Sequence, residues 1–185
     1  DIFDSMGLDA ALAAPTGRAA KRLSEATSHE ARTVHRLLEA EYDGTEENGS
    51  VIGRRLSFRR CEKDLLDEHV IIIDEASMLD SALTAALLRA IKPGARLIII
   101  GDSDQLPSVG AGNVLHDIID SGVFATVCLT EIFRQAQRSL IVTNAHAIDR
   151  GEMPVLDVKD RDFFFLPRSS DAEIAATVAD LCANR

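Results

Sequence analysis

The sequence predicts an α/β fold in which helices flank a parallel β-sheet. Short apolar segments of strand length alternate with segments of helical spacing, an order typical of parallel sheets with right-handed crossovers. Residues 69–74 and 96–101 are rich in Ile, Val and Leu, as strands buried on both faces are. The chain has 185 residues, 46% of them hydrophobic, so it is long enough for one domain and part of a second.

Each predicted element rests on its periodicity and on the residues that end it. The first strand stops at Pro15, and the helix after residue 81 stops at Pro93 and Gly94. The expected strands cover residues 8–14, 69–74, 96–101, 123–129 and 163–166. The expected helices cover residues 16–25, 31–41, 81–91, 113–120, a segment ending near 149, and 171–183. We expect a domain boundary near Leu129, which gives a first domain over 1–128 and the start of a second over 129–185.

Composition excludes several classes of protein. No apolar run approaches the ~20 residues of a membrane helix, so no membrane association is expected. The three cysteines have neither zinc-site nor disulfide spacing and fit a reducing, cytoplasmic setting. A net charge of −10 argues against a general nucleic-acid coat protein, and the scarcity of aromatic residues argues against an extensive base-stacking platform.

Residues 41–60 interrupt the α/β alternation. Acidic residues dominate before Asn48-Gly49 and basic residues dominate after it, and Asn-Gly is a strong signal for a tight hairpin turn. The pattern favours a protruding β-hairpin, and a solvated loop is the alternative.

Two acids follow the strand over 69–74. Asp74 and Glu75 would lie at the carboxyl edge of the sheet, where open α/β sheets hold their ligands. In nucleoside triphosphatases the first such acid serves Mg²⁺ and the second activates the attacking water. An alternative is that both acids only cap the following helix.

Other candidate residues are polar side chains near predicted strand ends. Gln105 follows the strand over 96–101 and could position water beside a phosphate, or simply face solvent. Arg134, just after the expected boundary, could stabilise phosphoryl-transfer charge. Residues 16–36 carry a local charge of +3 and could follow a nucleic-acid backbone, or form only the outer face of an amphipathic helix. His35 in that segment has packing as its simplest role.

In combination these segments resemble superfamily 1 DNA helicases of the RecD-like group, which includes the exodeoxyribonuclease V alpha subunit. The resemblance runs from about residue 8 to 154 and lies in the order and wording of the helicase motifs. Ala14-Pro-Thr-Gly-Arg-Ala-Ala-Lys-Arg-Leu23 resembles motif Ia, followed by the Thr33-Val-His block. Ile73-Asp-Glu-Ala-Ser-Met78 resembles motif II, the Walker B segment. Gly101-Asp-Ser-Asp-Gln-Leu-Pro-Ser-Val-Gly110 resembles motif III, and Leu129-Thr-Glu-Ile-Phe-Arg-Gln-Ala136 resembles motif IV.

The resemblance implies two RecA-like domains of the P-loop NTPase class that bind ATP and Mg²⁺ and translocate along single-stranded DNA, with 5′-to-3′ polarity. It implies that Asp74 serves the metal, that Glu75 activates water, and that Gln105 and Arg134 sense the γ-phosphate. The DNA contacts implied by it are Thr16, Gly17, Arg18, Thr33 and His35. The insertion at 41–60 would be a strand-separating pin, and nuclease or helicase subunits would be possible partners.

The sequence departs from the family at the phosphate loop. A Gly-x-x-x-x-Gly-Lys-Ser/Thr motif is absent, and so are motifs V and VI. We therefore expect these residues to be an internal portion of a longer DNA-repair or recombination helicase, inactive as an ATPase by itself. Two alternatives are the helicase half of a conjugative relaxase and a non-hydrolysing module that binds DNA or a partner.

Overall fold

The computed structural model describes residues 2–43, 46–47, 50–51, 55–129, 138–158 and 160–184. The chain divides into two compact units, Asp1–Thr126 (unit 1) and Val127–Arg185 (unit 2). Unit 1 holds the parallel sheet and the hairpin, and unit 2 holds two helices.

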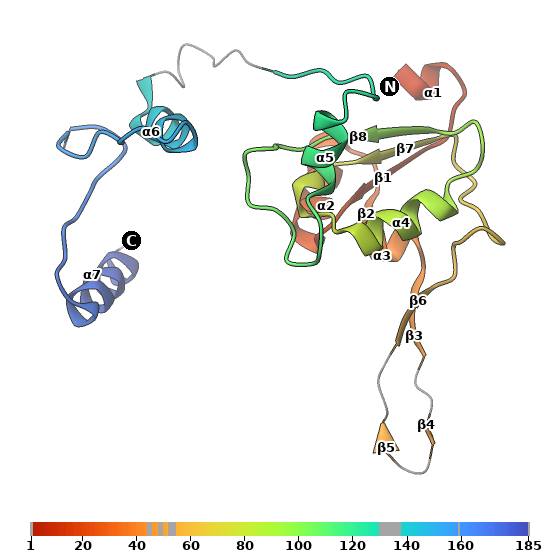
Figure 1. The fold of residues 1–185 in the computed structure, drawn as a ribbon, viewed down its shortest axis with the longest axis horizontal. Helices are drawn as coiled ribbons and strands as arrows, with labels where there is room; N and C mark the ends of the chain where they lie inside the picture. Colours follow the sequence, from red (N-terminus) through yellow and green to blue (C-terminus); the bar gives the residue numbers. More distant parts are fainter. Residues whose placement is uncertain are drawn as a thin grey trace. The chain divides into compact units, whose positions relative to one another are not determined.

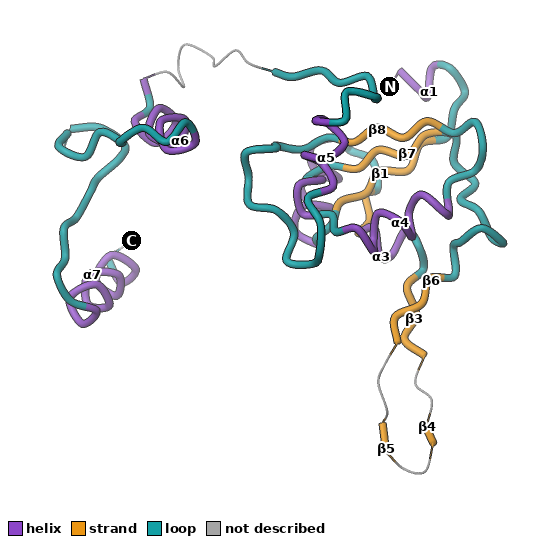
Figure 2. Tube along the Cα trace, viewed as in Figure 1, coloured by secondary structure: helices purple, strands orange, loops and turns teal. Residues whose placement is uncertain are grey.

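A four-stranded parallel sheet forms the centre of unit 1 (Figures 1 and 2). Its order is β2 (Ala31–Thr33), β1 (Ala10–Ala14), β7 (Val70–Ile73) and β8 (Arg96–Ile99). Neighbouring strands are all parallel, with Ala13 opposite Ile73 and Ile73 opposite Ile99. The predicted fold class, a parallel sheet flanked by helices, is confirmed.

Helices pack on this sheet and bury its apolar side chains. They are α2 (Gly17–Thr27), α3 (Val34–Leu37), the 3₁₀ turn η1 (Ala76–Met78), α4 (Ser81–Ala90) and α5 (Val114–Asp120). The short helix α1 (Ile2–Ser5) precedes β1 and contains no buried residue. The largest fully buried side chains are Val34, Leu38, Val70, Ile71, Ile73, Leu79 and Leu87. Burial of each of these side chains stabilises the fold by roughly 1.5–3 kcal/mol. Because Val70, Ile71 and Ile73 of β7 are among them, the core fixes the position of this strand and of the residues that follow it.

The segment over 41–60 forms paired antiparallel strands. β3 (Ala40–Asp43) pairs with β6 (Arg55–Phe58), and β4 (Glu46–Glu47) pairs with β5 (Ser50–Val51). Asn48 and Gly49, the predicted turn, lie outside the described residues. In Figure 1 the β3–β6 ribbon extends away from the four-stranded sheet.

The predicted helix over 31–41 is wrong. Residues 31–33 instead add the edge strand β2 beside β1, with Ala14 opposite Thr33. The helix that follows lasts one turn, because Glu39 adopts a left-handed conformation (φ 51°) and the next residue begins β3. Backbone partners offered by neighbouring strands outweigh helical periodicity here.

The predicted strands over 123–129 and 163–166 are also wrong. Val123, Val127 and Leu129 are 78%, 88% and 96% exposed, and Phe164 to Leu166 are about half exposed. Apolar alternation forms a strand only beside a partner edge, and no described strand pairs with either segment.

Unit 2 contains α6 (Leu140–Asp149) and α7 (Asp171–Ala183), and both match the helices expected from the sequence. The buried Asn144 side chain bonds the backbone of Val155 in both directions, at 2.9 and 2.8 Å. Asp162 accepts the Leu140 N–H at 2.7 Å, and hydrogen bonds led by that from Ser139 lower the pKa of this carboxyl. Among the described residues, no helix is long and apolar enough to cross a membrane.

Candidate functional site

The two candidate acids lie directly after β7, at the carboxyl edge of the sheet. Asp74 donates its backbone N–H to the Ala13 carbonyl at 2.9 Å, and its Oδ1 accepts the Glu75 N–H at 3.0 Å. Glu75 is left-handed (φ 55°, ψ 40°), and η1 begins after it. Such a conformation costs a non-glycine residue about 1–3 kcal/mol and is found most often at functional sites. Both side chains are half-buried, so the turn holds two carboxyls where a ligand can reach them.

Gly101 allows the end of β8 to approach this turn closely. The Ile100 carbonyl accepts the Ala76 N–H at 2.9 Å, and Ile100 donates to the Ile73 carbonyl at 2.8 Å. A Cβ on Gly101 would lie 2.8 Å from Leu115 Cδ2 and 3.1 Å from the Ala76 nitrogen. Only glycine therefore lets the motif II turn and the start of motif III lie against each other.

The far end of the motif III loop docks on the first turn of α4. Asp80 caps this helix, since its Oδ1 accepts the Leu83 N–H at 2.7 Å, and Ser81 donates to the Ala111 carbonyl at 2.9 Å. A Cβ on Gly110 would overlap the Asp80 carboxyl and lie 2.7 Å from Asp80 Cβ. Sequence reasoning missed Asp80 and Gly110, although the Asp-Ser pair before a helical segment is a recognisable N-cap signal.

The two predicted γ-phosphate sensors remain predictions. Gln105 is exposed on the motif III loop, where its Nε2 donates to Asp102 Oδ2 at 3.3 Å. Among the described residues, no hydrogen bond joins Gln105 to Asp74 or Glu75. Arg134 lies outside the described residues.

The predicted DNA contacts gather at the ends of the adjacent strands β1 and β2. Thr16 caps α2, accepting the Ala19 N–H at 3.2 Å, and Thr33 caps α3, accepting the Arg36 N–H at 3.2 Å. Gly17 opens α2, and a Cβ added there would meet nothing within 4 Å, so its role is not one of close packing. The structure thus places two hydroxyls and the backbone N–H groups of two helix starts at one edge of the sheet.

His35 has a packing partner as well. Its ring centroid lies 6.0 Å from that of Phe58 at the base of the hairpin, with the rings tilted by 46°. The contact accounts for the position of the half-buried ring, and the DNA contact that the family resemblance implies for it stays a prediction.

The basic segment 16–36 is partly neutralised on the surface. Lys21 pairs with Glu25 at 3.8 Å, and Arg32 pairs with Glu30 at 3.1 Å, which lowers the pKa of Glu30. Arg18 and Arg22 are exposed, and no ion pair within 4.0 Å joins either to a described carboxylate. Arg36 is exposed and without such a pair as well, so these three arginines offer the uncompensated positive charge of the segment.

The donor set fits a magnesium ion that a nucleotide also ligates. Mg²⁺ is held in such sites by one or two carboxylates together with phosphate oxygens and water. Asp74 uses Oδ1 for the Glu75 N–H and keeps Oδ2 for a further ligand. Among the described residues, no cluster of three or more His, Cys, Asp or Glu could hold a metal ion.

A parallel sheet with paired acids at its carboxyl edge is a RecA-like fold of the P-loop NTPase class. A family model described as an AAA domain matches residues 1–164, and the chain belongs to this family. The chain is 40% identical over 154 residues to the ATP-dependent RecD2 DNA helicase of Deinococcus radiodurans, covering 83% of this chain and 19% of that protein. It is 40% identical over 160 residues to the RecBCD enzyme subunit RecD of Mycobacterium tuberculosis, covering 77% of this chain and 26% of that protein.

A solved structure of Pif1 helicases at forked double-stranded DNA aligns with 97% of this chain at 20% identity and a TM-score of 0.49. The chain spans about a fifth to a quarter of the length of the first two relatives. The resemblance to RecD-like superfamily 1 helicases is thereby confirmed.

Proposed function

We propose that these 185 residues form the central portion of an ATP-dependent DNA helicase that couples ATP hydrolysis to 5′-to-3′ translocation on single-stranded DNA. The observation that carries the proposal is the turn of Asp74 and the left-handed Glu75 at the carboxyl edge of a parallel sheet, against Gly101 of the motif III loop. The RecD2 relative, 40% identical, is named as an ATP-dependent DNA helicase, which supports the helicase activity, and we propose DNA recombination or repair as its setting.

In this proposal each acid has one role. Asp74 would hold Mg²⁺ through Oδ2, and the metal would neutralise charge on the nucleotide phosphates when both are bound. Glu75 would accept a proton from the attacking water, and its half-buried carboxyl is within reach of a ligand at this edge of the sheet. Gln105 and Arg134 would orient water and stabilise phosphoryl charge.

The DNA strand would contact the edge formed by β1 and β2. Thr16, Gly17 and Thr33 would present hydroxyl and backbone N–H groups to phosphates, with Arg18 as a charged contact. Such contacts read the backbone, which suits an enzyme that must move along any sequence. The β3–β6 hairpin would separate the strands of a duplex.

Partner subunits would belong to the same proposal. The RecD relative is named as a subunit of the RecBCD enzyme, whereas the RecD2 relative is named as a helicase in its own right. The molecular mass of the full-length protein in solution, measured by light scattering, would distinguish a lone helicase from a complex member.

The decisive experiment is strand displacement by the full-length protein on duplexes with a 5′ or a 3′ single-stranded tail. The proposal expects ATP-dependent displacement of the 5′-tailed duplex and ATP hydrolysis that rises when single-stranded DNA is added. Binding of DNA without ATP hydrolysis would favour a non-hydrolysing module instead. Displacement only from the 3′-tailed duplex would contradict the polarity.

A further inference from the structure

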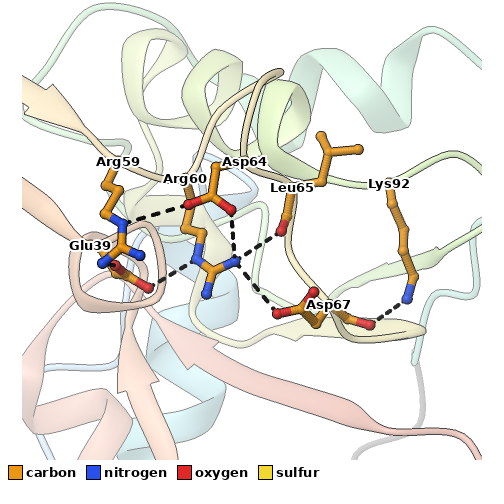
Figure 3. A network of polar contacts seen from close by, with 7 residues as sticks. All are labelled: Glu39, Arg59, Arg60, Asp64, Leu65, Asp67 and Lys92. Atoms are coloured by element: carbon orange, nitrogen blue, oxygen red, sulfur yellow. Dashed lines mark hydrogen bonds and ion pairs between the residues drawn. The ribbon is translucent and has the colours of Figure 1, made fainter.

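The base of the β3–β6 hairpin is fixed to unit 1 by a connected set of charged side chains, which we call the base clamp (Figure 3). Its members are Glu39, Arg59, Arg60, Asp64 and Asp67. Glu39 immediately precedes β3 and Arg59 immediately follows β6, so the clamp closes across both strands where the hairpin begins.

Arg60 is the centre of the base clamp. Its Nε donates to Glu39 Oε1 at 2.9 Å, and its Nη1 donates to the Leu65 carbonyl at 3.0 Å. The same Nη1 lies 3.4 Å from Asp64 Oδ1 and 3.5 Å from Asp67 Oδ2. The Arg60 side chain is only 20% exposed, the least of any side chain in the clamp. The hydrogen bond from Arg60 is the main cause that lowers the pKa of Glu39, so the pair is ionised at neutral pH.

Other contacts hold the same joint. Arg59 Nη1 reaches Glu39 Oε2 at 2.9 Å, and the Arg59 backbone N–H donates to the Glu39 carbonyl at 3.2 Å. The Arg60 N–H donates to the Leu38 carbonyl at 3.1 Å. Glu39 is left-handed, and this sharp change of direction is what leads the chain from α3 into β3. Phe58 packs on the buried core and against the His35 ring.

The clamp continues to the helix that borders the catalytic loops. Lys92 Nζ donates to the Asp67 carbonyl (Figure 3). The Leu66 N–H donates to the Ala90 carbonyl at 2.8 Å. Ala90 is the last residue of α4, and Lys92 follows two residues later. At the other end of this helix, Asp80 is the N-cap and lies against the motif III loop. The hairpin base and the catalytic edge are thus attached to opposite ends of one helix.

We propose that Glu39 and Arg60 are positioning residues that hold the hairpin at a fixed angle on the sheet, and that strand separation depends on this. A pin driven into a duplex separates it only if the pin does not yield, and a two-stranded ribbon joined by free loops would yield. This inference rests on the proposed function, since it assigns the clamp a part in unwinding. Arginine suits the position because its planar fork bonds several acceptors at once, which a lysine cannot reproduce.

An isolated exposed ion pair would not serve this purpose, because such pairs contribute little to stability. The Arg89–Glu62 pair is of that kind, at 3.3 Å with both side chains 65% exposed. It lies at the same end of α4 and gives a matched control, Arg89→Gln, which removes the same charge and leaves the clamp intact.

The test compares Arg60→Gln, Arg60→Lys and Arg89→Gln in the full-length protein by three measurements. These are amide hydrogen exchange, ATP hydrolysis stimulated by single-stranded DNA, and displacement of a duplex. Loss of charge-assisted hydrogen bonds is expected to speed exchange of the Arg59 and residue-60 amides by about tenfold. The amides of β7 should exchange as in the wild type, which shows that the fold is retained.

Displacement should fall by about tenfold in both Arg60 variants, while DNA-stimulated ATP hydrolysis changes by less than about twofold. Arg89→Gln should match the wild type in all three measurements.

Two results would overturn the inference. Unchanged exchange at the hairpin base in both Arg60 variants would show that the clamp does not fix the hairpin. Faster exchange with unchanged displacement would show that the fixed angle does not matter for unwinding. Absence of DNA-stimulated ATP hydrolysis in the wild type is a separate outcome, which would refute the proposed function while the exchange measurement still decides whether Arg60 holds the hairpin.

Discussion

Replacing Gly110 by Ala places a methyl group into the first turn of α4, where no space exists for it. The new Cβ would lie 2.7 Å from Asp80 Cβ and 2.8 Å from Asp80 Cγ. The backbone of Gly110 does not have a positive φ, so the cost comes from this overlap alone. Overpacking of this kind costs roughly 1–3 kcal/mol, and moving Asp80 aside would also weaken its cap, worth about 1 kcal/mol.

A double-mutant cycle on this chain tests the magnitude. Asp80→Gly removes the three atoms nearest to the methyl group and costs roughly a few tenths of a kcal/mol at an N-cap. Gly110→Ala should therefore lower the free energy of unfolding by about 1–3 kcal/mol in the wild type but by less than about 0.5 kcal/mol beside Asp80→Gly. Urea unfolding gives the change in the free energy of unfolding that Gly110→Ala causes in each background. Hydrogen exchange of the Ser81 amide, which donates to the Ala111 carbonyl, checks that the change lies at this contact. Equal costs in the two backgrounds would refute the docking of the motif III loop on α4.

Three further predictions concern activity, DNA and pH. The 185-residue chain alone should release no phosphate from ATP, because no Gly-Lys phosphate loop is among its residues, and measurable turnover would contradict this. Arg18→Glu should weaken single-stranded DNA binding equally for all sequences. The slope of the logarithm of the binding constant against the logarithm of salt concentration should become shallower by about the amount that one phosphate contact contributes, whereas a sequence-dependent loss would exclude a backbone contact. The hydrogen bond from Arg60 lowers the pKa of Glu39 in the folded state. The contribution of Glu39 to stability is therefore present above its pKa in the unfolded chain, and it is lost as the pH falls through its pKa in the folded state. Base-clamp amides, corrected for intrinsic exchange, should lose protection below about pH 4 and not between about pH 5 and 8.

The parallel sheet could be predicted because its signals are local. β7 is a run of Val and Ile bounded by a charged pair, and β8 repeats the pattern before Gly101. Thr16 and Asp80 are N-cap residues whose side-chain bonds form within three residues of sequence. The helices that begin near residues 16 and 81 could therefore be predicted, although the cap at Asp80 was missed.

Elements that depend on distant partners could not be predicted in the same way. Residues 31–33 have helical spacing, but β1 offers them a free strand edge, and that edge decides their conformation. Residues 123–129 have the composition of a strand and no described partner, so they form none.

The same reason explains what was missed at the site. The charges on either side of the hairpin were visible as runs, but their pairing was not. Glu39 and Arg60 are separated by 21 residues and meet only because β3 and β6 pair. Gly101 is conspicuous only once Ala76 and Leu115 are seen beside it.

The central claim is that the carboxyl of Glu75 activates water for an ATP-driven DNA motor. The most direct test is the rate of ATP hydrolysis by the full-length protein, with saturating single-stranded DNA, in the wild type, in Glu75→Gln and in the surface control Glu62→Gln. Loss of a general base should lower turnover by about 10²–10⁴-fold in Glu75→Gln, with nucleotide and DNA binding retained and Glu62→Gln at the wild-type rate. Turnover in Glu75→Gln within a few-fold of the wild type would contradict the account.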